Sequence, residues 1–303
     1  MKKCLFIVNP SSGRQRAARV AREVIGYLID GRIIDQLEIF YTEKKPESAY
    51  RRALSLVPGE YDFVVGVGGD GTISEVASGI YQSGCCIPLV MIPFGTVNDF
   101  ASVMGLPADP EKVAELIRNF HTKEVDLGKL NDRFFVNVAA GGLLTDVAYK
   151  VPKEEKAAVG RLAYYMDILR EFPEQYKNAG VMLHVDSEEF TGDVDALVFL
   201  IANSCSVGGM KQAVPAANVS DGLLDVLILR NVDLAASAPT LLLKLAQGTH
   251  PEAEEFVYFQ TKKVKIAQTA GQPIVLDYDG EAMKDGMPLT ASVVEKAVTL
   301  VIP

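Results

Sequence analysis

The sequence predicts a two-domain protein in which a doubly wound α/β domain precedes a largely antiparallel β domain. Its length of 303 residues exceeds the size at which one hydrophobic core usually stops growing. Up to residue 120, short apolar runs alternate with amphipathic stretches, a pattern typical of parallel strands with crossover helices. After residue 125, apolar positions alternate over short segments bounded by Gly, Asn and Asp, which indicates antiparallel strands.

The first domain, 1–125, is expected to alternate strands with helices. Apolar runs predict strands at 5–8, 37–41, 63–67 and 88–92. Amphipathic stretches predict helices at 15–29, 47–56, 73–81 and 111–120. Asp109 is the expected N-cap of the last helix, with Pro110 at its first position.

The second domain, 126–290, is expected to be mostly β. Strands are predicted at 134–138, 181–185, 196–202, 224–229, 256–259, 264–266 and 274–278. Two helices are predicted near 157–171 and 232–246. A last strand, 297–302, has no obvious partner in the sequence, and residues 291–303 are expected to return to the first domain.

Composition excludes several classes of protein. With 39 acidic and 30 basic residues the net charge is -9, which opposes binding to nucleic acid and general attraction to anionic membranes. The N-terminal apolar run is too short for a signal peptide, and no stretch is long enough to cross a bilayer. Four cysteines in a chain of this length match neither a disulfide framework nor a paired zinc motif, so reduced thiols and a cytoplasmic location are expected.

The most informative motif is a glycine-rich turn after the strand at 63–67. Gly68, Gly69 and Gly71 surround Asp70 just before a predicted helix, and glycines there let backbone N–H groups approach phosphate oxygens. A carboxylate in such a turn suits a nucleotide if Mg²⁺ bridges the two. The turn is not a P-loop, and a glycine turn also serves simply to pack a helix on a strand, so both interpretations stand for this motif alone.

Two further loops favour the nucleotide interpretation. Residues 9–13 end the first predicted strand and residues 93–100 end the fourth, so three loops are expected at one edge of the sheet. They supply hydroxyls, backbone donors and two carboxylates, which suit a nucleoside triphosphate with Mg²⁺. Arg14, beside the first loop, is a candidate phosphate contact.

Six strings, in this order, give the chain a family resemblance. NPSSG, GGDGTISE, PFGTVNDF, AAGG, SDGLLD and DGE resemble the diacylglycerol kinase catalytic domain family, which includes sphingosine kinases and bacterial lipid kinases, and length and order look most like its compact soluble bacterial members. GGDGT is shared with NAD kinases and resembles a phosphofructokinase motif. Glu75 and the PFGTVNDF loop are therefore the features that distinguish the diacylglycerol kinase family from these other kinases. The resemblance implies a Rossmann-like nucleotide domain, a β-sandwich lipid domain and an active site in the cleft between them.

The resemblance also implies roles for individual residues. Nucleotide contacts fall on Asn9, Ser12, Gly13, Thr42, Gly69, Asp70, Gly71, Thr72, Glu75 and Thr96. Glu281 would be the base that takes the proton of the lipid hydroxyl, and Asp70 and Asp99 would organise a catalytic Mg²⁺. A structural Mg²⁺ site would use the Asp221 carboxylate with backbone oxygens of Asn218 and Leu223.

The residues around Glu281 and Asp221 also have simpler interpretations. Glu281 follows Asp277 and Asp279, and like charges in such a cluster can raise the pKa of a carboxyl toward that of a general base. Asp279-Gly280 is also typical of a hairpin turn with solvated acids, and the residues alone favour this second interpretation. Asp221-Gly222 is open to the same choice between metal site and turn.

The expected activity is transfer of the ATP γ-phosphate to the hydroxyl of a membrane lipid, with diacylglycerol favoured and phosphatidic acid as product. Phosphatidylglycerol, a sphingoid base or NAD are alternative acceptors, and a non-catalytic lipid-binding or regulatory protein is the alternative of another class. The lipid substrate requires transient peripheral contact at the inner membrane surface and an apolar groove, although the overall acidity opposes docking. A basic segment with Lys150, Lys153, Lys156 and Arg161 is a candidate docking site. The sequence leaves open whether the protein forms a homodimer.

Overall fold

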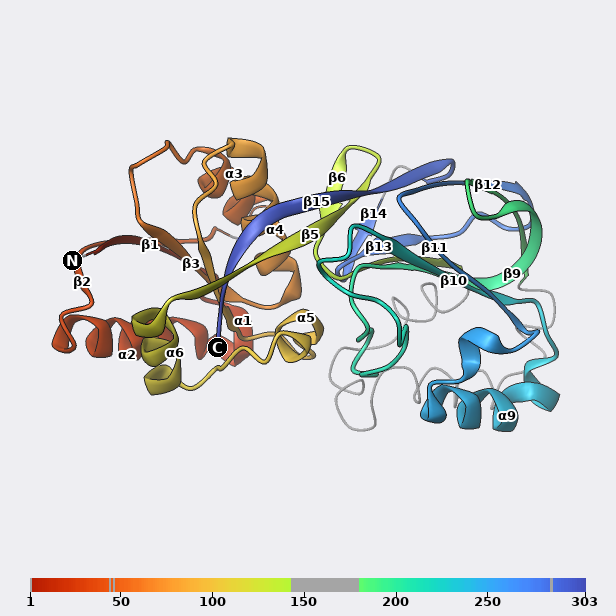
Figure 1. Ribbon diagram of the computed structural model, residues 1–303, viewed down its shortest axis with the longest axis horizontal. Helices are drawn as coiled ribbons and strands as arrows, with labels where there is room; N and C mark the ends of the chain where they lie inside the picture. Colours follow the sequence, from red (N-terminus) through yellow and green to blue (C-terminus); the bar gives the residue numbers. More distant parts are fainter. Residues whose placement is uncertain (1, 44, 46, 143–179, 284–285) are drawn as a thin grey trace. The chain divides into compact units, whose positions relative to one another are not determined.

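The computed structural model describes residues 2–43, 45, 47–142, 180–283 and 286–303 (Figure 1). The chain divides into two compact units: unit 1 comprises Met1–Leu127 with Glu295–Pro303, and unit 2 comprises Gly128–Val294. The chain passes from one unit to the other within strand β5 (His121–Leu130) and returns within strand β15 (Leu289–Ile302). In sequence, unit 2 is therefore an insertion near the end of unit 1.

Unit 1 is built on a parallel sheet. Its strands are β1 (Lys2–Val8), β2 (Ile34–Tyr41), β3 (Phe63–Gly68), β4 (Leu89–Pro93) and the end of β15. The spatial order is β15–β4–β3–β1–β2, with parallel pairing throughout. Because β2 and β3 lie on opposite sides of β1, the strand order reverses between β1 and β3, which is the place where open α/β sheets bind ligands.

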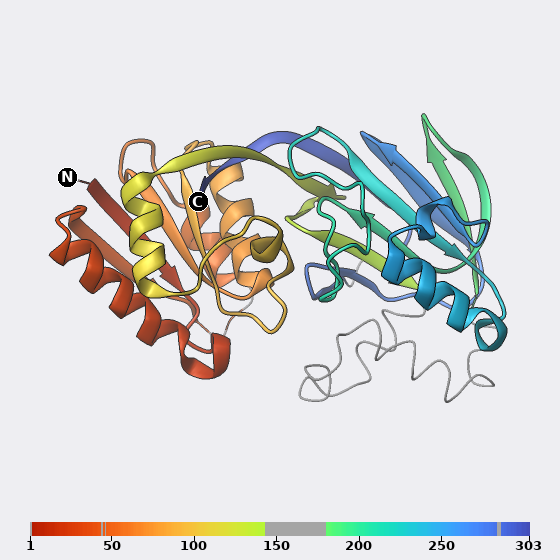
Figure 2. The same ribbon diagram turned by 60° about the horizontal axis from the view of Figure 1, so that its bottom comes forward.

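Helices cover both faces of this sheet (Figures 1 and 2). Helices α2 (Ala17–Asp30) and α6 (Pro110–Asn119) pack on the face that carries Phe6 and Val65. Helix α4 (Asp70–Ser83) packs on the opposite face, where Gly66 meets side chains of its first turns, and α3 (Ser48–Leu54) packs on α4. The short helices α1 (Ser12–Gln15) and α5 (Asp99–Val103) follow β1 and β4.

Unit 2 is an antiparallel β structure. Its strands are β6 (Arg133–Phe135), β7 (Val138–Gly142), β8 (Val181–Ser187), β9 (Thr191–Ala202), β10 (Leu224–Arg230), β11 (Phe256–Thr261), β12 (Lys263–Ala270), β13 (Leu276–Tyr278) and β14 (Glu281–Met283). The order is β14–β13–β7–β9–β8–β12–β15, with β10 joining β9 to β11. Helix α9 (Leu234–Gln247) and a 3-10 turn (His250–Glu252) connect β10 to β11.

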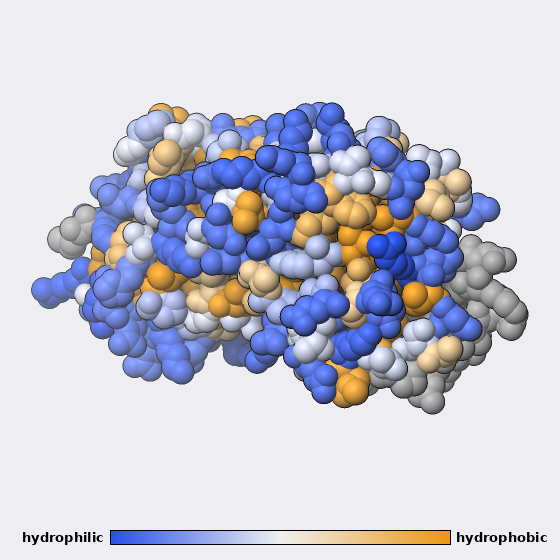
Figure 3. Space-filling model, turned by 45° about the vertical axis from the view of Figure 1, so that its right-hand side comes forward, coloured by the Kyte–Doolittle hydropathy of each residue, from blue (hydrophilic) through white to orange (hydrophobic). Residues whose placement is uncertain are grey.

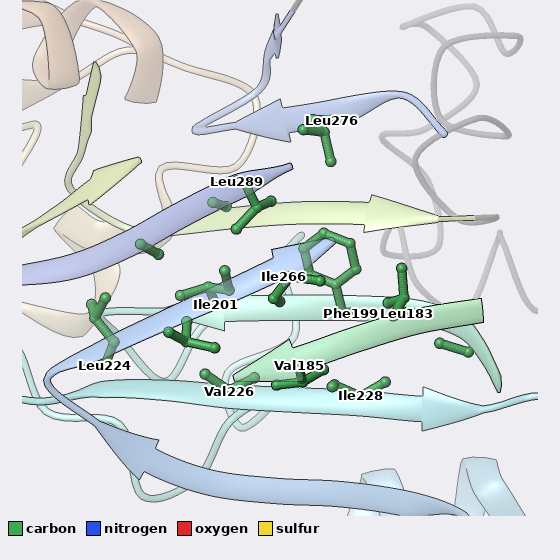
Figure 4. Close-up of a cluster of buried hydrophobic side chains, with 14 of the residues drawn as sticks. Leu183, Val185, Phe199, Ile201, Leu224, Val226, Ile228, Ile266, Leu276 and Leu289 are labelled. Atoms are coloured by element: carbon green, nitrogen blue, oxygen red, sulfur yellow. The ribbon is translucent and has the colours of Figure 1, made fainter. Parts of the chain in front are cut away.

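Alternate residues of these strands build a large apolar core (Figure 4). Leu183 of β8, Phe199 of β9 and Ile266 of β12 are almost completely buried in it. Since strand side chains alternate between faces, every second residue of each strand points inward. Full burial of such a side chain stabilises the fold by about 1.5–3 kcal/mol.

Most predicted elements are present, with several differences. The Asp109 carboxylate accepts a hydrogen bond from the Lys112 N–H, and Pro110 begins α6, so this helix start is confirmed. The prediction of one continuous strand at 134–138 is wrong, because Val136 and Asn137 separate β6 from β7. Strand β5 was not predicted, and the last strand begins earlier than predicted and pairs with β12, β4 and β5.

The helix predicted at 157–171 lies outside the described residues. Among the residues that the structure describes, no helix has the length and apolar character needed to cross a membrane. The expectation of a parallel α/β domain followed by an antiparallel β domain is confirmed.

Candidate functional site

The three predicted loops of unit 1 meet at the carboxyl ends of β1, β3 and β4. The Asn9 side-chain amide donates a hydrogen bond of 3.0 Å to the Thr72 hydroxyl, which joins the first loop to the second. The Phe94 backbone N–H donates to the Gly68 carbonyl at 2.6 Å, which joins the third loop to the second. The loops therefore form one continuous structure across the point where the strand order reverses.

Two of the glycines are required by close approach of these loops. A Cβ atom on Gly69 would lie 3.0 Å from the Gly95 Cα atom. At Gly13, where φ is +58°, a Cβ atom would lie 2.8 Å from the Phe94 ring. The loops thus present backbone with few side chains, the kind of surface that accepts phosphate groups at a helix N-terminus.

Asp70 and Asp99 both lie at this edge of the sheet. Asp70 begins α4, and its carboxylate accepts a hydrogen bond of 3.0 Å from the Asn98 backbone N–H. Asp99 comes directly after Asn98 in the sequence, begins α5 and is only 6% exposed. The structure therefore brings the two predicted carboxylates into neighbouring first turns.

Asn98 organises the third loop, a role that we did not predict. Its φ is +55°, its side-chain amide donates to the Gly95 carbonyl at 3.2 Å, and its backbone N–H binds Asp70. Asn adopts the left-handed conformation more readily than most residues. The sequence offered one signal for this role, because an Asn two residues after Thr96 in a glycine-containing loop is a candidate for the left-handed conformation.

Glu75 has a structural contact that its predicted role did not include. Its carboxylate accepts hydrogen bonds from the backbone N–H groups of Ala49 at 3.0 Å and Tyr50 at 3.3 Å, in the first turn of α3. A carboxylate at a helix N-terminus stabilises that helix. Glu75 therefore connects α4 to the segment that follows Thr42.

The other predicted nucleotide contacts surround the same loops. Ser12, Gly71 and Thr42 are half-buried, and Thr96 is exposed. The Thr42 backbone N–H donates to the Val8 carbonyl at 2.9 Å. Arg14 lies in α1.

The residues of unit 1 fit a nucleotide-bound Mg²⁺ better than an all-protein metal site. Within the described residues, no group of three or more His, Cys, Asp or Glu side chains is arranged to hold a metal ion. Mg²⁺ in phosphoryl-transfer sites is usually held by one or two carboxylates together with substrate phosphates and waters. Asp70 and Asp99, beside a glycine-lined helix N-terminus, match that donor set.

In unit 2, Glu281 begins β14 next to a two-residue turn. Tyr278 and Glu281 pair across the β13–β14 hairpin, and both turn residues, Asp279 and Gly280, have positive φ values of +48° and +86°. This is the geometry of a type I′ turn, which Asp-Gly favours. The Glu281 side chain is exposed to solvent.

The two aspartates of this hairpin have structural partners. The Asp277 carboxylate accepts a hydrogen bond of 3.1 Å from the Gly280 N–H across the turn. The Asp279 carboxylate, only 8% exposed, accepts hydrogen bonds from the backbone N–H groups of Val136, Asn137 and Val138. A hairpin of solvated acids is therefore wrong for Asp279.

The predicted metal turn in unit 2 is an exposed loop before β10. The Asp221 carboxylate accepts from the Leu223 N–H at 3.0 Å, and the Asn218 side-chain oxygen accepts from the Ser220 N–H at 3.2 Å. Four residues after Asp221, burial raises the pKa of Asp225 to about 6, while the Tyr258 hydroxyl donates to its carboxylate at 2.6 Å. These contacts suit a turn, and the Mg²⁺ site stays a prediction.

The turn and the hairpin lie at the same end of the unit 2 sheet. Ala202 of β9 pairs with Val138 of β7 on one side and with Asp225 of β10 on the other. Val138 is also the residue whose N–H binds Asp279. Glu281 and the Asp221 turn therefore belong to one region of unit 2.

Among the described residues, the large apolar side chains with the greatest exposure are spread over the surface. On the face seen in Figure 3, hydrophilic residues cover most of the surface, and apolar residues gather in an area right of the centre as well as in scattered spots. The most exposed large apolar residues, Val57 at 60%, Leu243 at 57% and Ile29 at 54%, come from separate elements, and scattered residues of this kind are common on soluble proteins. The basic segment with Lys150, Lys153, Lys156 and Arg161 lies outside the described residues.

Phosphate-accepting backbone and paired carboxylates at a strand-order reversal are features of enzymes that transfer phosphoryl groups. With its antiparallel second unit, the chain is a kinase of the two-unit α/β-plus-β class. Comparison with known proteins identifies the family. Residues 3–130 match the model of the diacylglycerol kinase catalytic domain, and residues 138–302 match that of the YegS C-terminal NAD kinase beta sandwich-like domain.

Curated relatives give the same result over nearly the whole chain. A diacylglycerol kinase of Staphylococcus epidermidis is 34% identical over 280 residues, which cover 92% of this chain and 86% of the relative. A diacylglycerol kinase of Bacillus subtilis strain 168 is 30% identical, with 93% and 90% covered. The chain belongs to the diacylglycerol kinase family and is an ATP-dependent lipid kinase.

Solved structures share the fold. A crystallised protein of Bacillus anthracis strain Sterne superimposes with a TM-score of 0.83 at 24% identity, covering 99% of this chain and 95% of that one. A diacylglycerol kinase from the same organism superimposes with a TM-score of 0.73 at 19% identity, covering 99% and 97%. These structures confirm the predicted fold class. The family models and the curated relatives confirm the predicted family and kinase activity.

Proposed function

We propose that the lipid acceptor is diacylglycerol and that the product is phosphatidic acid. Transfer of a phosphoryl group to this acceptor rests on the joined loop structure of unit 1, in which Asp70 and Asp99 lie in neighbouring first turns beside glycine-lined backbone. The names of the curated relatives support the choice of acceptor. NAD kinase activity and a non-catalytic lipid-binding role are disfavoured by the family match.

In this proposal, the oxygen of the lipid hydroxyl attacks the γ-phosphorus of ATP. The bond from that phosphorus to the bridging oxygen breaks, ADP leaves, and the hydroxyl proton passes to the Glu281 carboxylate. Asp70 and Asp99 would hold Mg²⁺, which when bound would neutralise charge on the phosphates. Glu281 is exposed at the start of β14, where its carboxylate is accessible to a substrate.

The nucleotide contacts in the proposal are those predicted from the sequence. Backbone at Gly13 and Gly69 to Gly71 would approach the phosphates, with the Arg14 side chain as a further phosphate contact. The remaining contacts are Asn9, Ser12, Thr42, Thr72, Glu75 and Thr96. The contact of Asn9 with Thr72 and that of Glu75 with α3 support a second role for these side chains in fixing the loops.

The same proposal places the enzyme transiently at a membrane. Diacylglycerol stays within a bilayer, so a chain acting on it must reach the bilayer surface during each turnover. A net charge of -9 opposes anionic surfaces, which favours a local and reversible contact. Binding to vesicles of neutral and anionic lipid, measured by sedimentation, tests this point.

The central experiment is transfer of labelled γ-phosphate from ATP to diacylglycerol in mixed micelles with Mg²⁺. The variants are Glu281→Ala and Asp70→Asn, the latter keeping an oxygen that can accept the Asn98 N–H. Matched controls are Asp186→Ala, an exposed acid on β8, and Glu111→Ala, an acid in the first turn of α6. Loss of general-base catalysis predicts a fall in kcat of about 10²–10⁴-fold for Glu281→Ala.

Each outcome has a distinct meaning. Labelled phosphatidic acid from the wild type and both controls, lost in Glu281→Ala and Asp70→Asn, supports the substrate and the two roles. Transfer to phosphatidylglycerol or a sphingoid base in place of diacylglycerol would keep the mechanism and change the acceptor. Activity that persists in EDTA would remove Mg²⁺ from the proposal.

A further inference from the structure

Asp279 makes an unusual set of contacts for a residue in a hairpin turn. Its carboxylate accepts hydrogen bonds from three consecutive backbone N–H groups: Val136 at 2.6 Å, Asn137 at 2.9 Å and Val138 at 3.0 Å. Its own N–H donates to the Val138 carbonyl at 3.0 Å. Hydrogen bonds to an ionised acceptor are stronger than neutral ones, so the turn is bound firmly to the segment between β6 and β7.

That segment is itself held by buried polar side chains. The Asn137 side-chain amide donates to the Ser206 carbonyl at 3.0 Å, and the Ser204 hydroxyl donates to the Asn137 side-chain oxygen. The Asn203 side-chain amide donates to the Val136 carbonyl at 2.8 Å. All these residues are buried, and buried hydrogen bonds of this kind help to fix local structure.

The anchored turn directly precedes Glu281 in the chain. Strands β13 and β14 have three residues each, and β14 ends the sheet order of the described strands, next to β13. Glu281 is the first residue after the turn and pairs with Tyr278. Glu281 lies between this turn and Met283, whose side chain is buried in the apolar core. The position of the Glu281 backbone therefore depends in part on the turn that Asp279 holds.

We propose that Asp279 is a positioning residue for Glu281, an inference that rests on the proposed role of Glu281 as the base. Asp279 does not touch the reacting atoms and acts by fixing the turn. Two carboxylate oxygens can accept three N–H groups, whereas an amide replaces one oxygen by a further donor. Displacing a catalytic group by about 1 Å can cost about 100-fold in rate.

The test compares Asp279→Asn with Asp277→Asn. Both variants remove one charge from the same hairpin, but the half-buried Asp277 accepts a hydrogen bond from the Gly280 N–H inside the turn. Asn tolerates the φ of +48° found at residue 279, so the change acts on the carboxylate contacts. We expect kcat to fall about 100-fold in Asp279→Asn, with KM for ATP unchanged, and to change little in Asp277→Asn.

A double variant separates positioning from general damage. If Asp279 acts through Glu281, adding Asp279→Asn to Glu281→Ala lowers kcat no further. Hydrogen exchange should rise in Asp279→Asn for peptides covering 136–138 and 276–283, while unit 1 peptides stay unchanged. A further loss in the double variant, or unchanged exchange, would overturn the inference.

The remaining outcomes distinguish this inference from the proposed function. An inactive Glu281→Ala with a fully active Asp279→Asn overturns the positioning role and leaves the base assignment intact. An active Glu281→Ala with an inactive Asp279→Asn overturns both. If Asp279→Asn does not fold, Gly280→Ala replaces it, because Gly280 has a φ of +86° with open space around the added Cβ. Full activity of that folded variant would also overturn the inference.

Discussion

Replacing Gly79 by Ala should destabilise unit 1, although Ala is the better helix former. Gly79 lies inside α4, where this helix crosses α3. A Cβ atom at this position would lie 2.6 Å from the Ala53 Cβ, 2.6 Å from the Tyr50 carbonyl oxygen and 3.0 Å from the Leu54 nitrogen. Two of these three contacts are with backbone atoms, so α3 as a whole must move.

The magnitude follows from two opposing effects. Ala in place of Gly inside a helix stabilises it by about 1 kcal/mol. Inserting an extra methyl group into a packed contact typically costs about 1–3 kcal/mol, and the upper end applies because rigid backbone is displaced. The expected net loss is about 2 kcal/mol for Gly79→Ala.

Gly26→Ala provides a control of opposite sign. Gly26 is an exposed position inside α2, and its added Cβ would meet no atom within 4 Å. This change should stabilise unit 1 by about 0.5–1 kcal/mol. Urea unfolding gives the midpoints, and hydrogen exchange of peptides over 48–54 and 70–83 reports on unit 1 directly. A Gly79→Ala protein as stable as the wild type would refute the packing argument.

Three further predictions concern other parts of the chain. Burial lowers the pKa of His250 from its usual 6.5, so the unfolded state takes up the proton first and the free energy of unfolding should fall as pH drops below that value. Burial raises the pKa of Cys4 to about 12, so its thiol should resist alkylation at pH 8 while the exposed Cys86 reacts. Asp109→Ala removes the N-cap contact of α6 and should cost about 1 kcal/mol of stability.

Controls for these predictions lie within the same chain. His250→Gln should flatten the acid side of the stability curve; an unchanged curve in this variant would contradict the assignment. Alkylation of Cys4 in the native protein at the rate of Cys86 would contradict its burial. For Asp109, the Asp109→Asn variant keeps a capping oxygen and should retain most of the stability.

Local sequence patterns were sufficient to predict the strands and helices of unit 1, because each of these elements is marked by its own run of residues. Apolar runs and helical periodicity predicted β1, β3 and α4 within a few residues. The three loops could be placed together because the carboxyl ends of parallel strands share one edge of a sheet. The contacts that join the loops, such as Asn98 with Asp70, depend on side-chain positions across different strands and had no local pattern.

Unit 2 was harder to predict because its determinants are distant in sequence. Residues 134–138 read as one strand, yet Val136 and Asn137 leave the ladder to donate to Asp279, more than 140 residues away. The acid pattern of Asp277, Asp279 and Glu281 likewise gave no sign that one aspartate is buried. Burial of a charged side chain is decided by its partners, and those partners are backbone groups that no sequence pattern marks.

The return of the chain to unit 1 has a consequence for synthesis on the ribosome. Leu300 pairs with Leu89, and both Leu300 and Val301 are completely buried in unit 1. These residues are translated after the whole of unit 2, so the edge of β4 in the nascent N-terminal unit stays uncovered until residues 300 and 301 have been made and have left the ribosome. A nonsense mutation at Glu295, where the chain returns to unit 1, would therefore damage the unit that is translated first.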